Sequence, residues 1–166
     1  MKKIFVFVLA TFAIFHASNV NAADLMPVQD AKKYGVQQCI SKVRTVSNFL
    51  LKGADGYGDD TNWNKKDANR RLLSFFISRG YSDGDSQINM NFAPNNKGGC
   101  DAVYTETFVS ESRCSLVRET TFKTWKYRGS LNGKTLVLNK GFAYVYLTPA
   151  GKASNLCLMT KREVVY

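Results

Sequence analysis

The four cysteines are the most reactive side chains of this sequence, and Cys100 attracts attention because it follows the glycine pair Gly98 and Gly99. A cysteine on such a turn acts as a nucleophile when a neighbouring histidine lowers the pKa of its thiol and takes up its proton. The chain has a single histidine, His16, in an N-terminal segment that we expect to be cleaved. We therefore expect a disulfide at Cys100 instead of a catalytic thiolate.

An even number of cysteines in an exported chain predicts two disulfides, here among Cys39, Cys100, Cys114 and Cys157. Residues 102–109 have the pattern of an extended strand. Such a strand separates Cys100 from Cys114 by roughly 25 Å, against the ~4.4–6.8 Å between Cα atoms that a disulfide allows. Two pairings stay open: Cys39 with Cys100 and Cys114 with Cys157, or Cys39 with Cys114 and Cys100 with Cys157.

Acid–base chemistry without histidine would need carboxylates, and Glu106 is the carboxylate that we would test. It stands in the middle of a predicted strand, on the same side as Tyr104 and Phe108. Two acids a fixed distance apart are enough for a glycosidase, whereas the Ser-His-Asp triad and the common zinc hydrolase sites need histidine. Because most glutamates in such a position are paired or face solvent, we expect no catalytic residue and no enzyme.

Alternating oxygen ligands occur in two polar stretches, Asp60 to Asn64 and Asp83 to Gln87. A calcium-binding loop of the EF-hand type needs glycine at its sixth position, where these stretches carry Lys65 and Ile88. Turn formation explains both stretches better. We expect no metal site and no cofactor.

Positive charge is concentrated toward the end of the chain, where residues 112–162 contain ten basic side chains and one acidic side chain, Glu119. Within this region the segment FKTWKYRG interleaves cations with aromatic rings. Strand alternation would place Lys123, Trp125 and Tyr127 on one face of the strand. Such a surface suits a phosphate, a sugar acid, a nucleic-acid strand or an acidic protein. The alternative is a solvated face whose lysines discourage edge pairing, with the tryptophan in the core. The candidate contact residues here are Lys123, Trp125, Lys126, Tyr127 and Arg128.

The elements that must position these residues begin with a helix. Between residues 28 and 52 apolar residues recur at steps of three and four, and Gly53 follows as a C-terminal glycine. The next residues, 53–67, are rich in Gly, Asp and Asn and predict a long loop. Its two aromatic residues, Tyr57 and Trp63, are either anchors for a partner or a cap on the core.

From residue 68 onward the apolar pattern has the period of two that is typical of strands. A hairpin is predicted around Ser82, Asp83 and Gly84, and a second around Asn132 and Gly133. The run from 116 to 131 reads as a further strand. We expect an α+β fold, in which one N-terminal amphipathic helix packs on a bent, mostly antiparallel sheet of about six to seven strands.

The N-terminus has the layout of a secretory signal peptide: two lysines, an apolar run from Ile4 to Phe15, and small residues before Ala23. The run is shorter than the ~20 residues of a membrane span, and no cysteine follows the cleavage point to carry a lipid. We expect cleavage after residue 22, one domain over 23–166, and a periplasmic or secreted basic protein without a membrane span or lipid anchor.

These observations favour a binding protein over an enzyme. The first hypothesis is an inhibitor or toxin-immunity protein that occupies another protein in the cell envelope. The second is a module for anionic ligands such as lipopolysaccharide, peptidoglycan or nucleic acid. The third is a small enzyme without histidine that uses a carboxylate such as Glu106.

Overall fold

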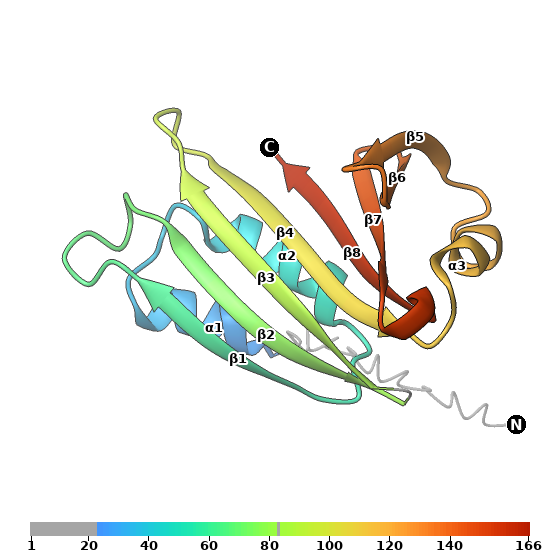
Figure 1. Cartoon of the computed structure of the whole chain (residues 1–166). Helices are drawn as coiled ribbons and strands as arrows, with labels where there is room; N and C mark the ends of the chain where they lie inside the picture. Colours follow the sequence, from blue (N-terminus) through green and yellow to red (C-terminus); the bar gives the residue numbers. More distant parts are fainter. Residues whose placement is uncertain (1–22, 83) are drawn as a thin grey trace, which may run out of the picture.

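The computed structural model describes residues 23–82 and 84–166, so the expected signal peptide and Asp83 of the first expected hairpin turn lie outside the described residues. Eight strands form one antiparallel sheet in the order β1-β2-β3-β4-β8-β7-β6-β5 (Figure 1). The elements are α1 (Met26–Lys33), α2 (Ile40–Leu51), β1 (Tyr57–Trp63), β2 (Leu73–Tyr81), β3 (Gly84–Pro94), β4 (Cys100–Ser110), α3 (Cys114–Thr120), β5 (Lys126–Leu131), β6 (Thr135–Lys140), β7 (Ala143–Ala150), a short 3₁₀ turn (Lys152–Ser154) and β8 (Leu156–Val165).

The expected α+β class is confirmed in outline, and two details of it are corrected. The described residues form eight strands instead of six or seven, and three helices instead of one. The sheet consists of two four-stranded meanders, β1 to β4 and β5 to β8, which join where β4 pairs with β8. We call residues 23–111 the first unit and residues 112–166 the second unit.

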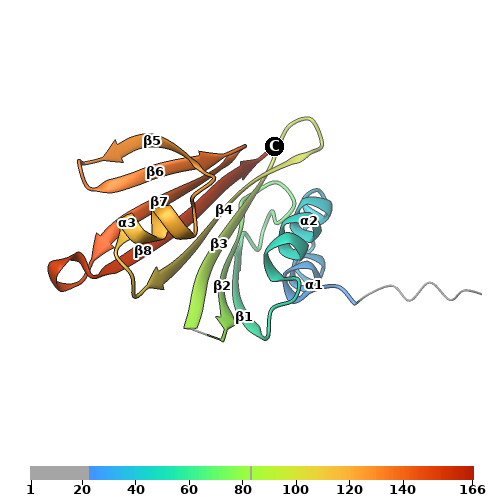
Figure 2. The same ribbon diagram turned by 90° about the vertical axis from the view of Figure 1, so that its right-hand side faces the viewer.

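Each unit has its own hydrophobic cluster beneath its own helices. In the first unit α1 and α2 cover β1 to β4, and in the second unit α3 lies against β7 and β8 (Figure 2). Both clusters lie on the same face of the sheet, because register pairs Ala102 with Val165 in one cluster and Phe108 with Met159 in the other. We call this face the inner face and the opposite one the outer face.

The expected single helix over residues 28–52 is two helices. The chain breaks at Gly35, whose φ of +79° lies in the region that glycine tolerates. Beyond it, the amide groups of Gln37 and Gln38 donate to Asn69 Oδ1 at 2.8 and 2.7 Å instead of continuing a helix. The apolar stripe is nevertheless buried as expected: Val36, Cys39, Val43, Val46 and Leu50 are at most 3% exposed.

The expected loop over residues 53–67 contains the edge strand β1, which pairs with β2 along its whole length. Glycine, aspartate and asparagine are poor strand formers, so the sequence pattern concealed it. Tertiary contacts compensate: the Trp63 ring stacks on Tyr34 at 3.5 Å between centroids, and Thr61 Oγ1 donates to Asp30 on α1 at 3.0 Å. The strand is therefore held by the helices that it faces.

The expected strand over residues 116–131 is also corrected, because its first part belongs to the helix α3. Val117 and Phe122 are buried in the cluster of the second unit, and Cys114 fixes the helix to β8 through a disulfide. Long-range packing thus overrides the local preference. The second predicted hairpin is confirmed, since Asn132 and Gly133, with φ of 49° and 66°, join β5 to β6.

The two disulfides have the first of the two pairings that the sequence left open. Cys39 bonds to Cys100 with Cα atoms 5.1 Å apart, and Cys114 bonds to Cys157 with Cα atoms 4.9 Å apart. In each unit the bond ties the beginning of a helix to the beginning of the meander's fourth strand. Such bonds are typical of proteins that fold in an oxidising compartment.

Candidate functional site

The basic and aromatic segment of the second unit does not form one alternating strand. Lys123 and Trp125 precede β5, and only Lys126, Tyr127 and Arg128 belong to it. Trp125 is half-buried, with its ring edge-on to Phe122 at 5.3 Å between centroids. The segment therefore divides its residues between the core of the second unit and its surface.

The helix α3 contributes a cation that the sequence did not single out. The Arg118 guanidinium lies over the Tyr127 ring, 4.7 Å from its centroid, and so connects α3 to β5. A shallow hollow of about 390 Å³ opens beside this contact. Its lining residues are Arg118, Glu119, Phe122, Lys123 and Trp125. Only the pairing of a helix with an edge strand brings Arg118 to this site, and no local sequence pattern marks it.

A second pair of cations, Lys126 and Arg128, lies on the outer face of the sheet. Lys126 pairs with Asn139 of β6, and Asn139 pairs with Tyr144 of β7, so the three residues share this face. Arg128 occupies a bulge in β5, and its Nε donates to Asn139 Oδ1 at 2.7 Å. Exposed apolar side chains surround this surface. Those of the second unit are Leu116 (50% exposed), Tyr127 (43%), Leu131 (54%), Phe142 (84%), Tyr144 (40%) and the C-terminal Tyr166 (88%).

Glu106 lies on the inner face near the boundary between the units and is only 7% exposed. Its Oε1 accepts hydrogen bonds from Tyr81 Oη at 2.8 Å and from the buried Ser86 Oγ at 3.2 Å. Burial, and next the hydrogen bond with Glu106, raise the pKa of Tyr81 above its ordinary value. The carboxylate thus already has two donors, as buried polar groups of folded proteins generally do.

Tyr57 and Trp63 both pack against the cluster of the first unit and are half-buried. Tyr57 Oη accepts a hydrogen bond from the Met26 backbone amide at 3.1 Å, at the start of α1. The Lys65 ammonium lies 5.9 Å from the Trp63 ring centroid, on the solvent side of its stack with Tyr34. These rings are part of the contact between β1 and the helices.

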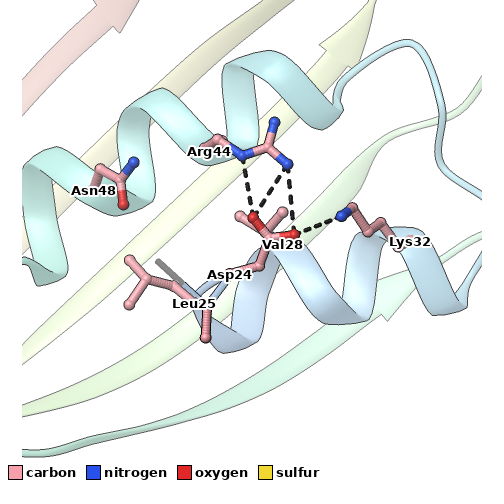
Figure 3. A pocket seen from close by; sticks show the side chains of 7 residues that line it. Asp24, Leu25, Val28, Lys32, Arg44 and Asn48 are labelled. Carbon is pink, nitrogen blue, oxygen red and sulfur yellow. Dashed lines mark hydrogen bonds and ion pairs between the residues drawn. The ribbon is translucent and has the colours of Figure 1, made fainter. Parts of the chain in front are cut away.

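A hollow of about 650 Å³ lies at the start of the described chain, between α1 and α2 (Figure 3). Its charges are paired with one another: Asp24 bonds to Lys32 at 2.5 Å and to Arg44 at 3.1 Å. The hydrogen bond with Lys32, and to a smaller extent that with Arg44, lower the pKa of Asp24 against the opposing effect of burial. Because its charged groups already have partners, this hollow is a weaker candidate than the surface around β5.

Within residues 23–82 and 84–166, no three His, Cys, Asp or Glu side chains lie close enough to hold a metal ion. No helix in the same part of the chain is long and apolar enough to cross a membrane. The chain matches no family model, no curated protein and no solved structure at a significant level.

Proposed function

We propose that the protein is exported and binds another protein of the cell envelope, as an enzyme inhibitor or a toxin-immunity protein does, through the surface of its second unit. The observation that carries this proposal is the unequal distribution of charge. Residues 112–166 contain ten basic and two acidic side chains, while residues 23–111 contain eleven of each. All of the net positive charge expected for the exported chain thus belongs to the second unit.

The composition of this surface supports a protein partner. Tyrosine and arginine are enriched at the centres of protein interfaces, and here Arg118 and Tyr127 form an exposed stacked pair. Two disulfides hold helices to the sheet before any partner arrives, which reduces the entropy lost on binding. A partner with an acidic surface would gain both association rate and specificity from the charge of the second unit.

The test compares two charge-reversed variants as baits in affinity capture from an envelope extract, read by mass spectrometry. The first changes Lys123, Lys126 and Arg128 to glutamate, and the matched control changes the exposed first-unit residues Lys65, Lys66 and Arg71. We expect the wild type and the control to enrich the same acidic protein and the first variant to lose it. If all three baits enrich the same proteins, or none enriches any, the proposal is wrong.

The same surface is also the one that would bind an anionic envelope ligand. Binding to lipopolysaccharide, peptidoglycan fragments or DNA through charge contacts weakens steeply as salt rises. Titrations at several salt concentrations distinguish the two cases. Tight, salt-sensitive binding of such a polymer, together with no enriched protein, would favour the anionic-ligand function.

A further inference from the structure

The strand β5 is one of the two edges of the eight-stranded sheet, and it is the exposed one. It pairs with β6 on one side only, and every residue except Gly129 is exposed. An edge strand presents unpaired backbone N–H and C=O groups to which another extended chain can bind. At the other edge, β1 is half-covered by its contacts with α1.

Cations lie around the β5 edge on both faces of the sheet. On the inner side lie Arg118 and Lys123, which line the hollow beside α3 together with one acidic residue, Glu119, and on the outer side lie Lys126 and Arg128. A strand added at this edge would direct successive side chains to alternate faces. Acidic side chains on either face of the added strand would therefore have cations nearby.

We propose that β5 binds an extended acidic segment of the partner protein, which joins the sheet as a ninth strand. This inference rests on the proposed function and specifies its mode of contact. Backbone hydrogen bonds along residues 126–131 hold the segment, and carboxylates at consecutive positions contact the cations on the two faces. A carboxylate on the inner side enters the hollow between Arg118 and Lys123, where the Trp125 ring forms part of the wall.

The charges also determine what does not bind at this edge. Two copies of β5 would bring the cations of one edge, among them Lys126 and Arg128, close to those of the other copy, and repulsion between like charges opposes such pairing. The β1 strand of a second copy, which carries Asp59 and Asp60, is a rival segment with the required charge. Self-association through β1 is therefore a distinct outcome that the experiment has to separate.

The experiment measures backbone hydrogen exchange of the whole disulfide-bonded protein, alone and with a decapeptide of glutamate as the probe. Inorganic polyphosphate of similar charge serves as the comparison, because it has no backbone donors. We expect the peptide to slow exchange of the amides in residues 126–131 and polyphosphate to leave them unchanged. Reversal of Lys126 and Arg128 to glutamate should weaken peptide binding about tenfold or more, since two surface ion pairs are lost. Reversal of Lys97 and Lys152, which lie in other turns, should change it less than about twofold.

Three results would overturn the proposal. The first is no binding of the peptide, and the second is binding without protection of β5 or with equal loss in both variants. The third is protection of β5 in the protein alone that rises with protein concentration, which would assign the edge to β1 of a second copy. If any of these occurs while the second-unit charge variant still loses its captured protein, edge pairing is wrong and the proposed function stands.

Discussion

Tyr104 of β4 donates its phenolic hydrogen to Glu163 of β8, with Oη and Oε2 2.7 Å apart, and so joins the two units at the one pair of strands that connects them. The Tyr104 ring is 2% exposed and belongs to the cluster of the first unit, whereas Glu163 belongs to the second unit. The hydrogen bond thus couples the packing of one unit to the position of the other.

Replacement of Tyr104 by phenylalanine should lower the free energy of unfolding by about 1 to 2 kcal/mol, because a hydrogen bond to a half-buried carboxylate is lost while the ring stays. Urea unfolding measures the change. Tyr144→Phe is the control, since that ring lies on the outer face and is 40% exposed. Equal losses in the two variants would contradict a specific role for the bond with Glu163.

The stability of the protein should fall at alkaline pH. Burial, and next the hydrogen bond with Glu163, raise the pKa of Tyr104 well above its ordinary value of 10.0, so the folded state keeps a proton that the unfolded chain releases. This contribution is fully present below pH about 10 and is lost as the pH rises further. We expect the unfolding free energy of Tyr104→Phe to fall less steeply between pH 9 and pH 11 than that of the wild type. The difference between the two slopes should correspond to at most about one proton released on unfolding. Parallel curves would show that another group is responsible.

Removal of the Glu106 side chain should destabilise the fold more than a change of its charge. In Glu106→Ala the fully buried Ser86 hydroxyl loses its acceptor, with an expected cost of about 1 to 3 kcal/mol. Glu106→Gln keeps an acceptor oxygen and should cost less. Thermal and urea unfolding measure both variants. If Glu106→Gln folds normally but abolishes the cellular activity of the protein, the enzyme hypothesis replaces the binding hypothesis.

Each disulfide should contribute separately to stability. They close segments with sequence separations of 61 and 43, for which the loss of unfolded-chain entropy predicts about 4 kcal/mol per bond. We expect Cys39→Ala with Cys100→Ala to increase hydrogen exchange mainly in α2 and β4. The corresponding change at Cys114 and Cys157 should act mainly on α3 and β8. A uniform increase over both units in either variant would show that the two clusters unfold together.

The buried positions of the fold could be predicted from the sequence because they follow from local patterns. The burial of Val43 and Leu50 follows from helical periodicity, and that of Ile88 and Phe92 from strand alternation. The turn at Asn132 and Gly133 follows from the backbone conformations that these residues tolerate. The candidate site was only partly predictable: Lys126, Tyr127 and Arg128 were identified, but the contribution of Arg118 was not.

The amino-acid sequence by itself determined the α+β class, the cysteine count that implied two disulfides, and the concentration of positive charge near the C-terminus, because composition and short-range periodicity carry this information. Only the tertiary structure decided that residues 57–63 form an edge strand and that residues 114–120 form a helix. The tertiary structure also decided the disulfide pairing, Cys39 with Cys100 and Cys114 with Cys157. The reason is that pairing between distant segments, which no local pattern encodes, stabilises Gly-Asp-Asn residues as β1 and surrounds β5 with cations from both faces.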